Sequence, residues 1–205
     1  MSYIPNYKLA TEKAIEVLED SEITQAPIVL RNIIRRYSGD IKVVPYSKLM
    51  KRRGLSLCDL IDMFNSRMGA CAYEPSTNHY IIFYNDALST ELCRFTVAHE
   101  LGHIFLGHHI KAGIDVLPCT FVSNADYEGY EKEANAFGRN LLSPAPLALA
   151  VTENNYNDYE KCADLQSAFW ISEKASSVRL SYINRDLRDY SDEMKSFVET
   201  IHVQK

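Results

Sequence analysis

Two histidines and a glutamate lie within five consecutive residues, His99-Glu100-Leu101-Gly102-His103. On a helix, residues four apart share one face with Cβ atoms about 5–6 Å apart, so both imidazoles could bind one metal ion. Glu100, one step further along, could reach water beside that ion and act as a general base. This H-E-x-x-H spacing is typical of zinc peptidases. The sequence therefore predicts His99 and His103 as metal ligands and Glu100 as the catalytic residue.

The surrounding residues indicate that both imidazoles face inward. They fall on one helical stripe with Leu92, Phe95, Thr96 and Leu106. Buried imidazoles need polar partners, and a shared metal ion would provide one for both. Two hydrogen-bonded core histidines are the alternative, but the intervening glutamate favours the metal site.

A third ligand should come from another element, because a catalytic zinc ion usually has three protein ligands and leaves its fourth position to water. No H-x-x-G-x-x-H extension follows the motif, and His108 and His109 come too soon after it. The helix expected at residues 127–142 offers Glu128, Glu131 and Glu133.

Position on that later helix favours Glu131. Glu131 borders the apolar stripe, whereas Glu133 lies toward polar Asn140, and Glu128 lies near Lys132. The stripe itself comprises Tyr127, Tyr130, Ala134, Phe137 and Leu141. Glu131 is therefore the expected third ligand. Periodicity alone also allows a solvated surface carboxylate at this position.

Composition is that of an ordinary globular protein of 205 residues, with 46% hydrophobic and 24% charged residues. The net charge of -5 argues against a protein that coats nucleic acid or anionic membrane. Five scattered cysteines without a C-x-x-C pair predict reduced thiols. The N-terminus has no signal-peptide core, and no apolar run reaches membrane-spanning length, so a cytoplasmic location is expected.

Hydrophobic periodicity predicts an α+β fold in which helices outnumber strands. Helices are expected at 7–20, after Pro27 up to residue 38, and at 56–63, 90–106 and 127–142. A strand is expected at 41–44 and a hairpin at 69–73 and 79–84, followed by a poorly patterned stretch from 111 to 126. The remainder reads as helical, with a polar break at 153–158. We expect a metallopeptidase domain at 1–150, including an N-terminal helix within 1–20, and a helical C-terminal segment at 151–205.

Two longer stretches resemble the ImmA/IrrE-type metallo-endopeptidases. Residues 94–103 read RFTVAHELGH and are followed by His108; residues 131–137 read EKEANAF and are followed by LLSP at 141–144. In the second family motif the first glutamate is the metal ligand, which corresponds to Glu131. Residues 165–180 are similar to the helix-turn-helix-like segment that follows the protease core in relatives. One departure is Gly138, where relatives more often carry alanine, and we expect it to loosen the helix packing.

This resemblance implies more than the motif does. It implies a zincin-like fold with a small sheet packed on the H-E-x-x-H helix, and one Zn2+ per chain held by His99, His103 and Glu131. It also implies cleavage of a helix-turn-helix repressor, in a protein encoded by a prophage, an integrative element or a stress-response locus. Spacing and periodicity by themselves predict only a metallopeptidase.

Two other classes of function compete with this prediction. A DNA-binding regulator could use residues 165–180, but Arg179, Arg185 and Arg188 are interleaved with acids and form no concentrated basic face, which favours a structural appendage. A non-catalytic protein could hold a repressor or toxin on a zinc-bearing scaffold, but such a site would not need Glu100.

Two secondary roles also stay open at this point. Asn135, one turn after Glu131, could orient a ligand or be an ordinary surface amide. The strand at 79–84 could pair with an extended substrate or simply cover the active-site helix.

Overall fold

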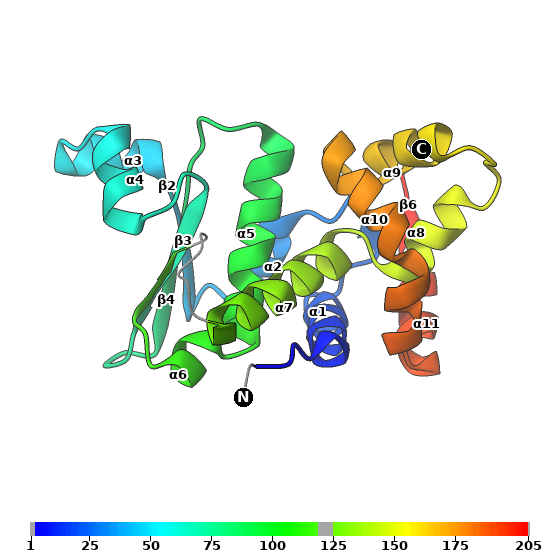
Figure 1. Cartoon of the computed structure of the whole chain (residues 1–205), viewed down its shortest axis with the longest axis horizontal. Coiled ribbons are helices and arrows are strands. Elements are labelled where there is room, and N and C mark those ends of the chain that lie inside the picture. The colour runs from blue at the N-terminus through cyan, green and yellow to red at the C-terminus, as the bar shows by residue number, and fades with distance from the viewer. Residues whose placement is uncertain (1–2, 119–124, 205) are drawn as a thin grey trace.

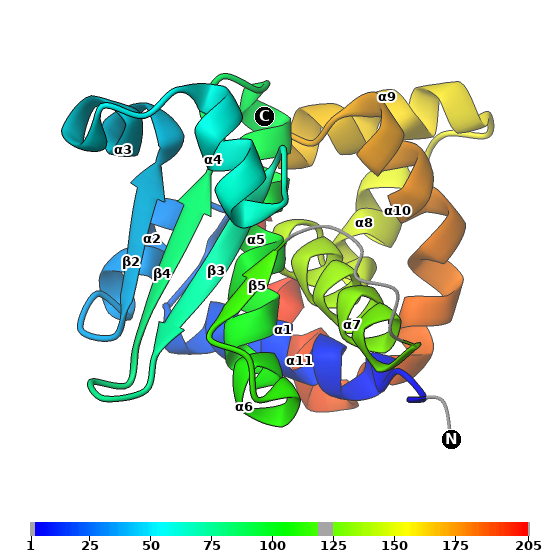
Figure 2. The ribbon, with the colours of Figure 1, turned by 60° about the vertical axis from the view of Figure 1, so that its left-hand side comes forward.

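The computed structural model describes residues 3–118 and 125–204 and has the expected α+β architecture (Figure 1). Its larger sheet has the order β2 (Ile41–Pro45), β4 (His79–Tyr84), β3 (Gly69–Glu74), β5 (Val116–Pro118), which can be followed across Figure 2. The predicted hairpin is confirmed, since β3 and β4 are antiparallel with Gly69 opposite Tyr84 and Glu74 opposite His79. β2 runs parallel to β4, and β5 runs antiparallel to β3.

Strand β4 cannot accept a substrate strand, so the suggested pairing of residues 79–84 with an extended substrate is wrong. β4 lies inside the sheet, and its backbone groups pair with β2 on one side and β3 on the other. It packs on α5, as the alternative proposed. Within the described residues the edges of this sheet are β2 and β5.

Helix α5 (Thr90–Phe105) carries the H-E-x-x-H motif and lies between the sheet and α7 (Ala125–Leu142) (Figure 1). The Ser89 side chain caps it by accepting a hydrogen bond from the backbone N–H of Leu92 at 3.3 Å. Every residue from Thr96 to Ile104 is buried, because the sheet covers one side of this half of α5 and α7 covers the other. Helix α1 (Tyr7–Asp20) packs in turn on α7.

Two glycines allow α5 and α7 to approach closely. A Cβ atom at Gly102 would lie 3.0 Å from the Cα of Ala134, and one at Gly138 would lie 3.2 Å from the backbone nitrogen of His99. Both distances are tighter than ordinary van der Waals contact. From the sequence we expected Gly138 to loosen the helix packing. The structure instead places Gly138 where the two backbones are close.

Most of the remaining elements match the sequence pattern. The predicted polar break separates α8 from α9, and a capping box of Ser56 and Asp59 starts α4. The bounds are β1 (Gln25–Ala26), α2 (Leu30–Arg36), α3 (Tyr46–Arg53), α4 (Leu57–Phe64), α6 (His108–Ala112), α8 (Ala145–Thr152), α9 (Asp158–Phe169), α10 (Glu173–Asp186), the 3-10 helix η1 (Leu187–Asp189), α11 (Asp192–Glu199) and β6 (His202–Val203).

Five short elements were not predicted: β1, α3, α6, β5 and β6. The basic run 51–53 is the last turn of α3, which Gly54 follows in the left-handed conformation (φ 66°). Cationic side chains are favourable at a helix C-terminus, and glycine commonly ends a helix there. β5 forms in the poorly patterned stretch, where its hydrogen bonds depend on the distant strand β3.

The C-terminal helices share their hydrophobic core with the rest of the chain. Leu165, Phe169 and Ile183 belong to the same buried cluster as Leu18 and Leu101. β1 also pairs in parallel with β6 near the C-terminus. We therefore propose that the division at residue 150 marks a difference in role between two parts of the chain that share one core.

Two further expectations from the sequence concern thiols and membranes. Cys58, Cys71, Cys93 and Cys162 are free thiols, and Cys119 lies outside the described residues. None of the helices in the described ranges combines the length and apolar character needed to cross a membrane.

Candidate metal centre

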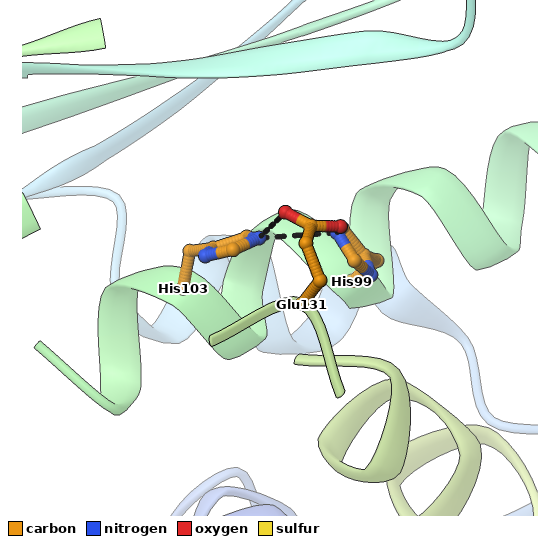
Figure 3. A group of neighbouring side chains, drawn as sticks. All are labelled: His99, His103 and Glu131. Carbon is orange, nitrogen blue, oxygen red and sulfur yellow. Dashed lines mark hydrogen bonds and ion pairs between the residues drawn. The ribbon is translucent and has the colours of Figure 1, made fainter. Parts of the chain in front are cut away.

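Helices α5 and α7 bring His99, His103 and Glu131 together, as Figure 3 shows. Glu131 lies 3.3 Å from the Nε2 atom of His99 and 3.1 Å from that of His103. The two Nε2 atoms are 3.1 Å apart, and all the potential ligand atoms lie within 4.8 Å of one another. The imidazoles project from successive turns of α5, and the carboxylate reaches them from α7.

The charge states of this group suit a metal ion. Burial lowers the pKa of His103 to about 3, although the neighbouring Glu131 opposes this shift. Burial acts to raise the pKa of Glu131, but its interactions with His103 and His99 outweigh burial and hold that pKa well below its ordinary value. At neutral pH the set is therefore a neutral imidazole on His103 beside an ionised carboxylate. Metal binding requires these forms of the two residue types.

A hydrogen bond to Asn135 also prepares His99 to bind a metal ion. The Nδ1 atom of His99 lies 3.1 Å from the Oδ1 atom of Asn135. An amide oxygen only accepts hydrogen bonds, so His99 carries its proton on Nδ1, and a neutral ring then directs the lone pair of Nε2 toward Glu131. A nitrogen lone pair and carboxylate oxygens that converge in a buried site call for a cation. The residues present therefore fit a metal ion, and Asn135 is more than an ordinary surface amide.

Glu100 is fully buried, at 0% exposure. Burial raises the pKa of the Cys71 thiol in β3, and the charge of Glu100 raises it further. That electrostatic effect indicates that the carboxylate lies toward the sheet side of α5. Glu100 is thus held in the protein interior, next to the pair of histidines in sequence.

The structure gives a place beside the site to two residues that the sequence analysis set aside as ligands, His108 and Glu133. The Nδ1 atoms of His108 and His103 are 2.9 Å apart, and the Nε2 atom of His108 lies 2.9 Å from the Oε2 atom of Glu133. Both residues are fully buried. Burial lowers the pKa of His108, with Glu133 opposing it. Burial acts to raise the pKa of Glu133, but hydrogen bonds from His108, Asn6 and Tyr3 hold it below its ordinary value.

Sequence reasoning placed Glu133 on the polar side of its helix, next to Asn140. That side is not solvated, because α1 and the residues before it cover it: Asn6 contacts Glu133, and Thr11 contacts Asn140. The polar stripe of α7 is thus an internal contact surface. Asn140 lies about two helical turns after Glu133 on the same polar side, which was the available signal that this side is special. Periodicity, however, cannot say whether a polar side faces water or another helix.

A cleft with a volume of about 780 Å³ adjoins the centre on the His99 side. It is not lined by His99, His103 or Glu131, but two of its lining residues contact His99. Asn135 does so by a hydrogen bond, and the ring centroids of Phe95 and His99 are 6.3 Å apart. Its walls come mainly from α5, α7 and α10. The lining residues are Tyr7, Met68, Ser89, Glu91, Leu92, Phe95, Lys132, Asn135, Arg139, Leu142, Ser143, Ile171, Ser172, Lys174, Ala175, Val178, Tyr182 and Arg185.

The comparisons with known proteins agree with the motif. A peptidase family model described as the IrrE N-terminal-like domain matches residues 60–181, more than half of the chain. The match spans α5, α7 and the segment that leads through α9 into α10. No curated protein matches the chain closely enough to count as a relative.

Proposed function

The chain belongs to the peptidase family of the IrrE N-terminal-like domain, and on this premise we propose that it is a zinc-dependent endopeptidase. The observation that carries the proposal is the convergence of His99, His103 and Glu131 from two helices. Glu100 stands beside the first histidine and provides the proton acceptor that a merely structural site would not need.

In the proposed mechanism the three converging residues hold one Zn2+ per chain. A zinc ion bound there would lower the pKa of water and polarise the scissile carbonyl. Glu100 takes the proton of the attacking water and passes it to the leaving amine. Asn135 keeps the proton of His99 on Nδ1, which directs the Nε2 lone pair into the site.

The substrate is proposed to be a helix-turn-helix transcriptional repressor, from the resemblance to ImmA/IrrE-type endopeptidases. Two features of this chain could receive such a polypeptide. The cleft beside His99 has a largely apolar lining with Lys132 and Lys174 among its residues. The edge strand β5 has one neighbour, β3, in the described part of the sheet.

The test is hydrolysis of a helix-turn-helix repressor, with the one encoded nearest to this gene as the first choice. Wild type and Glu100→Ala are compared, and zinc is measured in each preparation. We expect Glu100→Ala to retain zinc and lose cleavage, and His99→Ala to lose both. Equal cleavage by wild type and Glu100→Ala would remove Glu100 from the mechanism. Zinc binding without cleavage of the repressor would instead favour the non-catalytic binding protein.

The DNA-binding alternative loses one of its three arginines in the folded chain. Arg179 is fully buried, and its Nη2 donates to the Oδ2 atom of Asp186 at 2.6 Å. Arg185 also pairs with Asp186, at 3.2 Å. Arg188 is exposed but does not by itself make the basic face that DNA binding requires.

A further inference from the structure

We propose that Glu133 and His108 are positioning residues that fix the tautomer of His103 and so present its Nε2 atom to the metal. The inference rests on the proposed function, because it takes His103 as a ligand. The three side chains form a continuous buried row, in which the two histidines meet through Nδ1 atoms 2.9 Å apart. His108 then meets Glu133 at 2.9 Å.

The hydrogen bonds of Glu133, at one end of this row, determine which nitrogen of each histidine carries the proton. The Oε1 atom of Glu133 accepts hydrogen bonds from the Tyr3 hydroxyl at 2.9 Å and from the Asn6 backbone N–H at 2.5 Å. Both partners donate to the same oxygen, and hydrogen bonds of this kind favour the ionised carboxylate. An ionised carboxylate only accepts hydrogen bonds, so its other oxygen, Oε2, receives one from Nε2–H of His108.

A neutral His108 that donates from Nε2 has a lone pair on Nδ1. That lone pair can accept only if His103 carries its own proton on Nδ1. The Nε2 atom of His103 then has a lone pair, and it is this atom that lies 3.1 Å from Glu131. One carboxylate on α7 thus determines, through His108, which nitrogen of His103 is available to a metal ion.

The row is built from three separate parts of the chain. Gly107 takes the left-handed conformation (φ 68°), which ends α5 and starts α6 at His108, so that His108 turns back toward His103. The segment before α1 supplies Tyr3 and Asn6. Tyr3 packs against Gly129 of α7, where an added Cβ atom would overlap the Tyr3 ring. The N-terminal segment is therefore coupled to the metal centre as well as to the fold.

The two ligand histidines are oriented by different means. His99 is held by the amide of Asn135, an exposed residue beside the cleft. His103 is held by a buried imidazole and a buried carboxylate, both at 0% exposure. Groups that orient metal ligands typically contribute about 10–100-fold to metal affinity.

The test compares zinc affinity, measured by competition with a chelator, in wild type, Glu133→Gln and Tyr3→Phe. A glutamine at 133 has one acceptor oxygen for three donors, so His108 can no longer be held with its proton on Nε2. We expect zinc binding to weaken about 10–100-fold in Glu133→Gln and by a smaller factor in Tyr3→Phe. The visible spectrum of the Co2+-loaded protein should change in the same two variants.

Two matched controls separate positioning from general stability. Glu128→Gln makes the same substitution on the exposed side of α7, where Glu128 pairs with Lys132. Thr11→Val removes another buried hydrogen bond between α1 and α7, the one from Asn140 at 3.1 Å. Both controls should bind zinc as wild type does, even if Thr11→Val melts at a lower temperature.

The outcomes distinguish this inference from the proposed function. Wild-type zinc affinity in both Glu133→Gln and Tyr3→Phe would overturn the positioning role and leave the metal site standing. A wild-type protein that binds no zinc would overturn both. If Glu133→Gln does not fold, Tyr3→Phe decides the question, because it removes a single hydroxyl. Nitrogen NMR of the metal-free wild type gives a direct check, with the His103 proton expected on Nδ1.

Discussion

At the scale of residues, the proposed ligands converge on one point that a cation could occupy. His99, His103 and Glu131 lie within hydrogen-bond distance of one another. A ligand that binds the folded chain and not the unfolded one stabilises the fold. Zinc should therefore act on stability as well as on catalysis.

We expect zinc to raise the thermal unfolding midpoint of wild type. Linkage gives about 2.7 kcal/mol of stabilisation when free zinc is at 100 times its dissociation constant. Glu131→Gln should lose most of this increment, because the amide has no negative charge for the ion. Melting curves with zinc and with a chelator measure both effects. An equal zinc-dependent increment in Glu131→Gln would contradict its assignment as a ligand.

Asn135 gives a second prediction at this scale. Asn135→Leu removes the acceptor for Nδ1–H of His99 and should weaken zinc binding about 10–100-fold. Asn135→Asp keeps an acceptor oxygen at the same place and serves as the matched variant. Chelator competition should then rank wild type and Asn135→Asp together, above Asn135→Leu. If Asn135→Leu binds zinc as tightly as wild type, the amide does not orient His99.

At the scale of elements, the distance between α5 and α7 determines whether Glu131 can reach the histidines. Gly102 lies at the crossing, where a side chain would press on the backbone of Ala134. Ala134 is three residues beyond Glu131 on the same helix, so any separation at the crossing also moves the carboxylate. Helix packing is thus part of the metal site.

Gly102→Val should separate the two helices. Overpacking a close contact typically costs about 1–3 kcal/mol, and valine gains little in helix propensity over glycine. We expect a lower free energy of unfolding in urea and weaker zinc binding in the same variant. If Gly102→Val is less stable but binds zinc as tightly as wild type, the metal site tolerates a larger separation of α5 and α7 than we expect.

At the scale of the whole molecule, a buried ionic cluster joins the C-terminal helices to α7. Arg179 donates to Asn140 and to the backbone oxygen of Ser143, each at 3.1 Å, and it also pairs with Asp186. Arg139 of α7 reaches the same carboxylate at 2.9 Å. Arg139 also lines the cleft, so this cluster should help to hold the cleft in shape.

The cluster predicts loss of stability in acid. Burial acts to raise the pKa of Asp186, but Arg139, Arg179 and Arg185 outweigh it and hold the pKa below its ordinary value. A carboxyl group with a lowered pKa in the folded state stabilises it above the unfolded pKa, about 3.9. That contribution is lost as pH falls from about 5 through the folded pKa.

Asp186→Asn should therefore be less stable than wild type at neutral pH, by about 3–5 kcal/mol, because it leaves Arg179 buried without its counter-charge. The difference should begin to narrow below about pH 4, because the unfolded wild-type chain then binds a proton on Asp186 that the folded chain still resists. Urea unfolding of both proteins at pH 7 and pH 3.5 measures this. A difference that stays constant between the two pH values would show that the ion pair is not its cause.

The sequence by itself determined the elements whose information is local. Helix α1 has the predicted bounds because an Asn6 cap precedes an amphipathic run, and α5 follows from the Ser89 cap and its apolar stripe. The hairpin follows from two strand-like runs around Pro75-Ser76-Thr77-Asn78. The spacing of His99, Glu100 and His103 needs only one helix, so the motif could be interpreted before any tertiary contact was known.

Tertiary structure decided what depends on contacts between distant segments. Strand β4 became an interior strand because β2 pairs with it from a distant segment. Glu133 became a buried partner of His108 because the N-terminal segment covers the polar side of α7. Periodicity reports which face of a helix is polar, but burial is fixed by the element that packs on it. For that reason the proposed ligands could be named from the sequence, and the residues that orient His103 could not.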